Sequence, residues 1–498
     1  MGSYSRVAKT GVLWGFLSRG VNEAFAIPTS MVLARLLTPE DFGVGAAAAF
    51  FVQIATRITS LGFNTALVQL KVINRQHTAT VFAANLLFGV AAWLILTLTA
   101  GPLGRAFDSE AATAALPIAA LTFLISPFAA VPSALLVRDL RYREATILDG
   151  SFVVIACLSS VSLALMGYGY WSLIYSQVIA TTIPTIARMW VVQWWPSLAV
   201  SKAAFDDLLA FGMGLQAKRL LDSLAQNIDN LVVGRMLGLH ALGYYDRAFT
   251  MTTRAVNALN SAGPSVSFRI LAILSDDAER FRRAYRRLVL TATFIAYPTL
   301  ALLAVFAEEL FDVMFGSQWG PAVLPFRVLC VAGALKFVTG YASTATQSMG
   351  LVWGEVSRQL LYLAAIVAGA AVGATFGIVG TAAGVLGATA LMFGTMHHYL
   401  TQSTNITWRD VLQAQLPATL CAAGLLVLAL SIRGVLMGVV SDSLRVAVSL
   451  SVSIAFVLAF VRYCRFAELN EIVHETLLEY LPRATAWLPR RAERHVEG

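Results

Sequence analysis

The chain has 498 residues, of which 58% are hydrophobic and only 13% are charged, and its mean hydropathy is +0.71. Soluble globular chains usually carry about 25% charged residues, so this composition excludes an ordinary soluble enzyme. A net charge of +8 would suggest a nucleic-acid partner in a soluble protein. In so apolar a chain, the membrane topology explains this charge better.

Apolar runs of 18 or more residues recur along nearly the whole chain, and each is long enough to cross the hydrocarbon core as a helix. The runs do not alternate with a period of two, so we predict an all-α polytopic membrane protein. The first run contains Arg19 and Glu23 and is too long for a cleaved signal peptide, so we expect it to be a retained first span. The pattern predicts about fourteen spans: 10–35, 42–69, 78–101, 112–137, 145–167, 169–194, 207–235, 241–267, 287–307, 321–346, 352–376, 378–400, 411–432 and 442–463.

The distribution of Lys and Arg between the connections predicts the orientation. With the N-terminus in the cytoplasm, most connections expected inside are basic, as in Arg138–Arg143 and Arg280–Arg287. Connections expected outside, such as 38–41, 167–171 and 307–320, contain no Lys or Arg, and Arg105 and Arg433 are exceptions. We therefore expect a multi-pass protein of a bacterial inner membrane with both termini in the cytoplasm.

A repeat with an offset of 200 residues runs through the sequence. The stretch "MVLARLLTPEDFGVGAAA" (31–48) matches "LVVGRMLGLHALGYYDRA" (231–248), with Arg35 on Arg235 and Gly43 on Gly243. The two copies begin spans one and seven, which start on the same side, so they are parallel repeats. We expect the two glycines to permit a close approach or an unusual backbone angle where the next helix begins.

The repeat predicts the domain organisation. We expect a six-helix lobe at 1–203, a second at 204–402, an extra helix pair at 403–463 and a cytoplasmic tail at 464–498. Leu469, Val473, Leu477 and Leu481 share one helical face of the tail, which predicts an amphipathic helix on the membrane surface or at a partner. The four cysteines are far apart and lack metal-ligand spacing, and we expect no metal and no cofactor.

Charged side chains lie within the predicted spans. The repeat places Arg19 on Arg219 and Asn22 on Asp222, and spacings of three and four draw a polar stripe down one helical face. A charge at the bilayer centre costs roughly 2.5–3.5 kcal/mol, so these groups must pair or line a wet cavity. The predicted cavity cations are Arg19, Arg57, Lys218, Arg219, Arg254 and Lys336.

Three acidic residues, Glu23, Asp222 and Asp229, accompany these cations and leave the predicted cavity positive. Such a cavity suits an anion, and the planar fork of arginine suits phosphate. Two alternatives stay open: Lys218 and Asp222 could form an internal ion pair, and the acids could bind a coupling Na⁺ or proton. Arg35 and Arg235 are closer to the outer interface, where a long side chain can reach water.

With these residues in view, the chain resembles the lipid-linked oligosaccharide flippases, the polysaccharide branch of the multidrug/oligosaccharidyl-lipid/polysaccharide exporter superfamily. The stretches that carry the resemblance are "LARLLTPEDFGVGAAA" (33–48), "SLGFNTALVQ" (60–69) and "IDNLVVGRMLGLHALGYYDRA" (228–248). The resemblance implies two six-helix lobes in a V shape, an extra helix pair and alternating access.

The resemblance also implies a cargo, an undecaprenyl-pyrophosphate oligosaccharide carried from the cytoplasmic to the periplasmic leaflet for surface or exopolysaccharide synthesis. Basic cavity residues would hold the pyrophosphate, and Arg19, Arg57, Arg219 and Arg254 are the positions that match this role. It further implies drive by an ion gradient or membrane potential, and polysaccharide polymerase and export machinery as partners.

Three other functions compete with this interpretation. A drug exporter of the same superfamily would favour an acidic or aromatic cavity, and a lipid II flippase would share the pyrophosphate cargo. An integral-membrane polysaccharide polymerase or glycosyltransferase would need a sizeable outer loop or a cytoplasmic Asp-x-Asp site, and the sequence offers neither.

Overall fold

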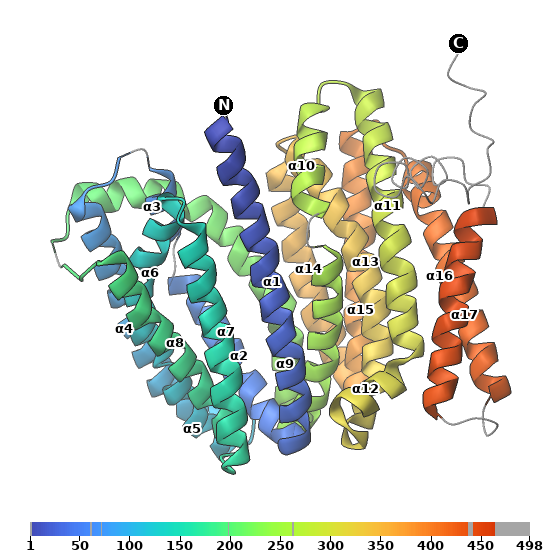
Figure 1. The fold of residues 1–498 in the computed structure, drawn as a ribbon, viewed down its shortest axis with the longest axis horizontal. Coiled ribbons are helices and arrows are strands. Elements are labelled where there is room, and N and C mark those ends of the chain that lie inside the picture. The colour runs from blue at the N-terminus through green and yellow to red at the C-terminus, as the bar shows by residue number, and fades with distance from the viewer. Residues whose placement is uncertain are drawn as a thin grey trace. The chain divides into compact units, whose positions relative to one another are not determined.

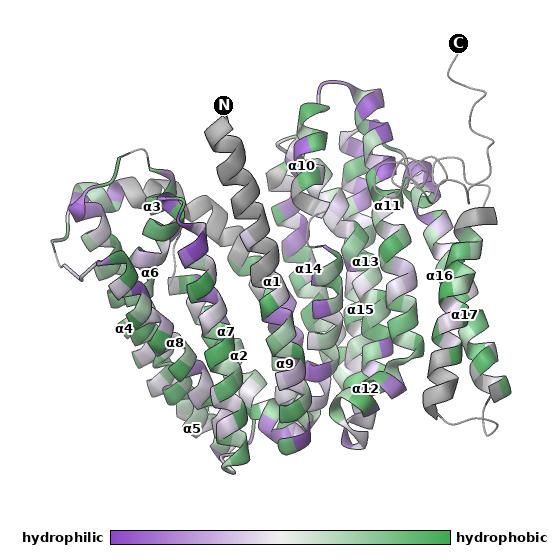
Figure 2. Ribbon diagram, viewed as in Figure 1, coloured by the Kyte–Doolittle hydropathy of each residue, from purple (hydrophilic) through white to green (hydrophobic). Residues whose placement is uncertain are grey.

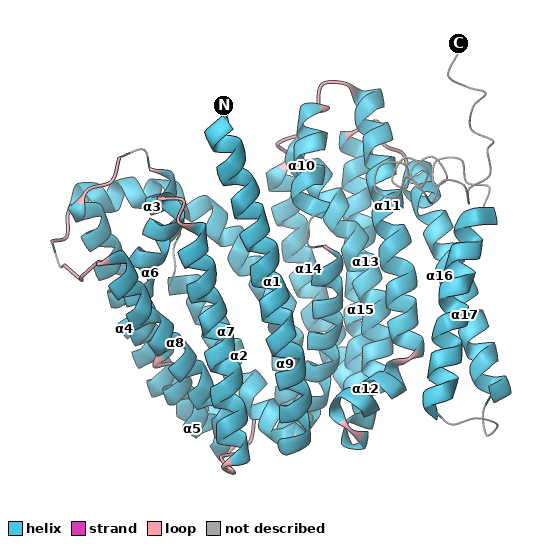
Figure 3. Cartoon of the chain, viewed as in Figure 1, coloured by secondary structure: helices cyan, strands magenta, loops and turns pink. Residues whose placement is uncertain are grey.

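The described part of the chain is helical and contains no strand (Figure 3). The computed structural model describes residues 2–59, 62–70, 72–197, 199–260, 263–436 and 442–463. The predicted tail at 464–498 lies outside these residues. Helix bodies are mainly hydrophobic and hydrophilic residues gather near helix ends, as on α11 (Figure 2). The all-α membrane fold predicted from the composition is therefore confirmed.

Nine stretches of described helix are long and apolar enough to cross a membrane, and the number of fourteen spans stays a prediction. Three predicted spans are interrupted. The span at 241–267 is divided between α9, which ends at Leu259, and α10, which begins at Gly263. The span at 42–69 is wrong as one helix, because Gly62, with φ 77°, separates α2 from α3. The span at 112–137 is broken near Ala120 into α5 and α6.

The chain forms two compact units. The first comprises Met1–Asp246 with the short segments Met314–Trp319 and Ala374–Ile378. The second comprises Arg247–Val313, Gly320–Gly373 and Val379–Gly498. The predicted lobe boundaries, 1–203 and 204–402, stay a prediction.

The first unit contains eight helices and the beginning of a ninth (Figure 1). They are α1 (Gly2–Leu36), α2 (Pro39–Thr59), α3 (Phe63–Gln69), α4 (Arg75–Ala106), α5 (Glu110–Ala119), α6 (Thr122–Arg138), α7 (Tyr142–Leu165), α8 (Trp171–Val192) and the long α9 (Lys202–Leu259).

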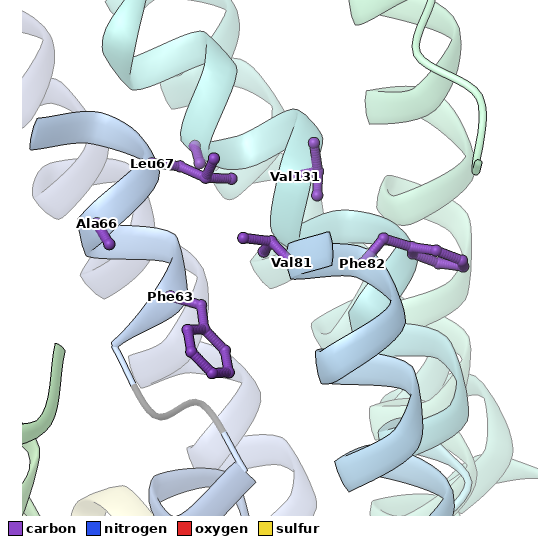
Figure 4. Packing of buried hydrophobic residues seen from close by; sticks show 7 residues of the cluster. Phe63, Ala66, Leu67, Val81, Phe82 and Val131 are labelled. Atoms are coloured by element: carbon purple, nitrogen blue, oxygen red, sulfur yellow. The ribbon is translucent and has the colours of Figure 1, made fainter. Parts of the chain in front are cut away.

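Helix α3 is held by an apolar core within the first unit. Phe63 and Leu67 of α3 pack with Val81 and Phe82 of α4 and with Val131 of α6 (Figure 4). Spacings of three and four residues place Phe63, Ala66 and Leu67 on one face of this short helix, which is turned toward its neighbours. Burial of this face compensates for the low intrinsic stability of a seven-residue helix.

The second unit contains the end of α9 and the later helices. They are α10 (Gly263–Ile273), α11 (Ala278–Val305), α12 (Ala307–Phe315), a 3₁₀ turn (Ser317–Ala322), α13 (Val323–Ser348), α14 (Val352–Ala374), α15 (Gly377–Ser403), α16 (Trp408–Leu436) and α17 (Asp442–Tyr463). Four of these, α12, the 3₁₀ turn, α14 and α15, also reach into the first unit.

Glycines let α14 and α15 approach closely in the second unit. A Cβ atom on Gly369 would lie 2.6 Å from the Gly384 carbonyl oxygen, and one on Gly384 would lie 1.9 Å from the Gly369 oxygen. Small residues recur at helical spacing along 377–388, a pattern typical of closely packed membrane helices.

The two copies of the repeated turn contact each other within the first unit. A Cβ on Gly43 would lie 1.8 Å from the carbonyl oxygen of Leu239, and one on Gly243 would lie 1.8 Å from that of Pro39. Because Pro39 and Leu239 are themselves 200 residues apart, the contact is reciprocal. The predicted close approach of both glycines is confirmed.

The two copies form their turn by different means. Thr38 and Asp41 build a capping box at the start of α2: the Thr38 amide donates to Asp41 Oδ2 (2.9 Å), and the Asp41 amide to Thr38 Oγ1 (3.2 Å). The second copy has Gly238 at the position of Thr38, and its φ of 84° is open to glycine at little cost. The unusual backbone angle therefore lies at Gly238 rather than at Gly243.

Helix α16 is fixed to α11 through Asp410. Its carboxylate is buried and accepts hydrogen bonds from Arg282 Nε (2.8 Å) and Nη2 (2.9 Å), and from the Thr407 amide (2.9 Å). Farther along the same pair, the Tyr297 hydroxyl donates to Gln415 Oε1 (2.6 Å). The cytoplasmic arginine cluster predicted from the sequence thus includes a residue that joins two helices.

We predict that Gly43→Ala destabilises the protein by about 1–3 kcal/mol, because the new methyl group would meet a backbone carbonyl that cannot turn away. This loss should exceed the small gain from the better helix propensity of alanine. Thermal unfolding in detergent measures the effect. Gly394→Ala is the matched control, since no atom lies within 4 Å of its Cβ position. Equal thermal midpoints for the two variants would contradict the close contact of Gly43 with the Leu239 carbonyl group.

We predict that Arg282→Ala lowers the thermal midpoint by several degrees, because Asp410 then loses its bidentate partner in a buried place. Arg280→Ala should have little effect, since Arg280 pairs with Asp277 at the surface. The two arginines are two residues apart on α11, so the comparison isolates the contact with α16. A similar midpoint for both variants would refute this role of Asp410.

Candidate functional site

The polar stripe predicted on the first and seventh spans lies on α1 and α9. Asn22 Oδ1 on α1 and Asn230 Oδ1 on α9 are both buried and accept no hydrogen bond from the residues that the structure describes. A buried acceptor without a donor is unfavourable, so each oxygen is suited to a water molecule or a ligand donor. This observation supports the polar character of the stripe independently of its charges.

The nine predicted site residues differ in their surroundings. Glu23, Arg57 and Lys336 are exposed, Asp222 and Arg254 are half-buried, and Asp229 is buried. The side chains of Arg19, Lys218 and Arg219 lie outside the described part of the structure. Helix positions are known for all nine: Arg19 and Glu23 on α1, Arg57 on α2, Lys218, Arg219, Asp222, Asp229 and Arg254 on α9, and Lys336 on α13.

The predicted cations are divided between the units. Arg254 and Lys336 belong to the second unit, and the other four to the first. Neither unit contains all six, so a cavity lined by all of them stays a prediction. Arg57 also lies in the last turn of α2 rather than half-way along a span, because α2 ends at Thr59.

Asp229 has a partner that the sequence did not predict. Its Oδ2 accepts a hydrogen bond from the Tyr245 hydroxyl at 2.8 Å, and both residues are buried. Sixteen residues of straight helix would span about 24 Å, so the contact requires the chain to turn at Gly238. No sequence spacing indicated this pair, since its formation depends on the backbone angle of one glycine.

Trp319 fastens the repeated turns together within the first unit. Its indole nitrogen donates to the carbonyl oxygen of Ala34 in the last turn of α1 (2.9 Å), and Gln318 Nε2 donates to the same oxygen (2.6 Å). The buried indole packs edge-on against Phe42 (5.3 Å) and Tyr244 (5.8 Å). Phe42 is next to Gly43 and Tyr244 is next to Gly243, so one tryptophan contacts both copies of the turn.

Sequence reasoning missed Trp319. Its segment, 307–320, was noted only for its lack of Lys and Arg. A tryptophan and a glutamine close together in this short connection were the available clue, because both can donate to helix carbonyls.

His397 lies near the end of the predicted span 378–400, where a histidine would ordinarily face water. It is instead fully buried between Phe393 (4.2 Å) and Trp408 (6.1 Å). Its Nδ1 lies 2.8 Å from the Phe393 carbonyl oxygen. The aromatic neighbours make this a packing position of the second unit.

Metal-ligating side chains do not cluster in the described ranges. No group of three His, Cys, Asp or Glu residues there is placed to hold a metal ion.

The chain is similar in sequence to proteins of polysaccharide biosynthesis. Residues 32–324 match the family model described as polysaccharide biosynthesis protein. The lipopolysaccharide biosynthesis protein WzxC of Escherichia coli is 22% identical over 379 residues, which are 74% of this chain and 76% of that protein. The succinoglycan biosynthesis transport protein ExoT of Rhizobium meliloti is 26% identical over 372 residues, 74% of this chain and 75% of that protein.

Solved structures share the fold. The lipid II flippase MurJ in an inward closed conformation superposes with a TM-score of 0.72 at 12% identity, over 94% of this chain and 99% of that one. An inward-facing multidrug resistance MATE transporter of the MOP superfamily gives a TM-score of 0.56 at 15% identity, over 82% of this chain and 94% of that one. At these identities the likeness establishes the fold and no more.

We predict that Tyr245→Phe lowers the free energy of unfolding by about 1–3 kcal/mol, because the buried Asp229 carboxylate would lose its phenolic donor. Tyr244→Phe is the matched control: Tyr244 packs its ring on Trp319 and His240, and removal of its hydroxyl leaves those contacts in place. Denaturation in detergent compares the two. If Tyr245→Phe is as stable as the control, Asp229 does not depend on Tyr245.

Proposed function

The chain belongs to the polysaccharide biosynthesis protein family, and we propose that it carries a polyprenyl-pyrophosphate-linked oligosaccharide repeat unit from the cytoplasmic to the periplasmic leaflet. The transport would proceed by alternating access and supply surface or exopolysaccharide synthesis. Two relatives are named for lipopolysaccharide biosynthesis and for succinoglycan transport, which supports a transport role in this synthesis. Beyond this transport role, we propose the lipid carrier, its pyrophosphate group and the direction of transport.

One observation carries the proposal: cationic side chains are exposed on helices that are otherwise apolar. Lys336 lies in the middle of α13, a helix with a span-length apolar window, and its side chain is exposed. Contact of that ammonium with lipid would cost roughly 2.5–3.5 kcal/mol, and exposure to water or to an anionic cargo would avoid this cost. Arg57 is also exposed, in the last turn of α2, where its guanidinium would be open to an anion.

The chemistry of these groups fits a pyrophosphate. Arg57 and Arg254 would present planar guanidinium forks to its oxygens, and Lys336 would add a point charge. Arg19, Lys218 and Arg219 extend this set in the proposal. Asn22 and Asn230, with their oxygens open to donors, would accept hydrogen bonds from sugar hydroxyls or from water.

The acidic residues fall into two groups in this proposal. Glu23 is exposed and Asp222 half-buried, so both would be accessible to a coupling Na⁺ or proton from water. Asp229 is buried with Tyr245. We therefore assign coupling to Glu23 and Asp222 ahead of Asp229.

We predict that Arg19→Ala, Arg57→Ala, Arg219→Ala and Arg254→Ala each slow translocation by about tenfold or more, because each would remove a charge-assisted hydrogen bond to pyrophosphate. The measurement is the accessibility of a fluorescent polyprenyl-pyrophosphate oligosaccharide to a membrane-impermeant reagent, in sealed proteoliposomes with an imposed potential and Na⁺ or proton gradients. Arg280→Ala, at a surface ion pair, is the control.

The outcomes separate the site from the function. Translocation that persists in all four variants would overturn the site and keep the function. If the wild-type protein translocates lipid II in preference to the lipid-linked oligosaccharide, the proposed cargo is wrong and lipid II takes its place. Wild type that moves neither lipid would refute the flippase and favour a drug exporter or an enzyme.

A further inference from the structure

A pocket of about 460 Å³ opens in the first unit, between the start of α4 and the segment that follows α8. Its described lining combines one cation, Arg75, with two indoles, Trp194 and Trp195, and with hydroxyl and amide groups that include Thr78 and Gln193. This volume lies within the range of small-ligand pockets, roughly 300–1,000 Å³. None of the residues named in this lining is acidic.

The guanidinium of Arg75 is available to a ligand. Neighbouring arginines of this unit are engaged: Arg138 donates to the carbonyl oxygens of Leu67 (2.9 Å) and Leu70 (2.6 Å), and Arg188 pairs with Asp149. By contrast, no hydrogen bond or ion pair joins the Arg75 guanidinium to another residue of the described ranges. An unpaired guanidinium beside indoles matches a phosphate group.

The residues around the pocket are held in place by contacts within the protein. Asn74 caps α4 by accepting a hydrogen bond from the His77 amide (3.0 Å), which fixes the start of the helix. Gln193 ends α8 in a left-handed conformation, φ 53°, which turns the following tryptophans toward α4. Trp194 is anchored against Phe82 at 5.6 Å.

The rim of the pocket has the character of a membrane interface. Trp195 is 59% exposed and packs edge-on against Trp190, itself 66% exposed, at 5.8 Å. Val72 and Val200, at the two segments that border the pocket, are also exposed. Tryptophans favour the headgroup level of a bilayer, and both segments are predicted to be cytoplasmic connections. The pocket would therefore open at the inner leaflet.

We propose that this pocket binds the phosphate-containing headgroup of an anionic glycerophospholipid from the cytoplasmic leaflet. The Arg75 guanidinium holds the phosphate, and Gln193 and Ser197 hydrogen-bond the polar headgroup. Trp190 and Trp195 contact the glycerol and upper acyl region. Such basic, aromatic-rimmed pockets suit anionic headgroups on the cytoplasmic side. The site is separate from the predicted cargo cavity and does not depend on translocation.

The test is native mass spectrometry of the purified full chain with phosphatidylglycerol or with zwitterionic phosphatidylcholine. Each wild-type protein molecule should retain one more lipid molecule in the presence of phosphatidylglycerol than in the presence of phosphatidylcholine. Arg75→Ala should weaken that binding by about tenfold, the loss of one charge-assisted contact. Trp195→Ala, a change at an exposed side chain, should weaken it without disturbing the fold. Arg143→Ala, an exposed cation outside the pocket, is the matched control.

A second measurement keeps the test independent of mass spectrometry. Phosphatidylglycerol should raise the thermal midpoint of wild type and of Arg143→Ala, but not that of Arg75→Ala. Equal retention of the two lipids, or unchanged binding in Arg75→Ala, would overturn the proposal. Displacement by inorganic phosphate alone, or by a polyprenyl-pyrophosphate oligosaccharide in preference to phosphatidylglycerol, would also overturn it, in favour of a free-anion site or a cargo site.

Discussion

A helix that ends at the edge of an apolar layer leaves carbonyl groups that need donors, and this requirement governs much of the structure. The chain meets it with long polar side chains from other helices. Arg138 covers carbonyls at the end of α3, and Arg327 donates to Ala304 (3.1 Å) near the end of α11. Trp319 does the same for Ala34 at the end of α1. Basic residues near helix ends therefore cap neighbouring helices, in addition to any part they have in setting the topology.

The repeated turn shows a second use of the backbone. Gly43 and Gly243 bring two helix starts into contact with each other's preceding turn, which a side chain on either would prevent. Trp319 closes the contact from one side through its neighbours Phe42 and Tyr244. The two copies of the repeated turn thus share a packing requirement but differ in how each turn is formed, as the capping box at Thr38 and the glycine angle at Gly238 illustrate.

Periodic and compositional features could be predicted from the sequence, and features that depend on tertiary geometry could not. Long apolar runs predicted the helical membrane fold, and the repeat predicted the close approach at Gly43 and Gly243. The bond from Tyr245 to Asp229 needs the turn at Gly238, and the pairing of Arg282 with Asp410 joins residues 128 positions apart. The predicted cations are placed on their helices, but their assembly into one cavity depends on the two units together.

The position of a charged residue along its helix indicates whether the residue can hold helices together. Charges near helix ends, such as Arg138 and Asp410, are satisfied by carbonyls, amides or opposite charges, and they hold helices in place. A charge in mid-helix has no helix end to cap, because the carbonyls around it already bond within the helix. Lys336, exposed half-way along α13, is of this second kind. Its cost in hydrocarbon falls where water, an anion or another polar group of the protein reaches it, and the first two are what the proposed transport would supply.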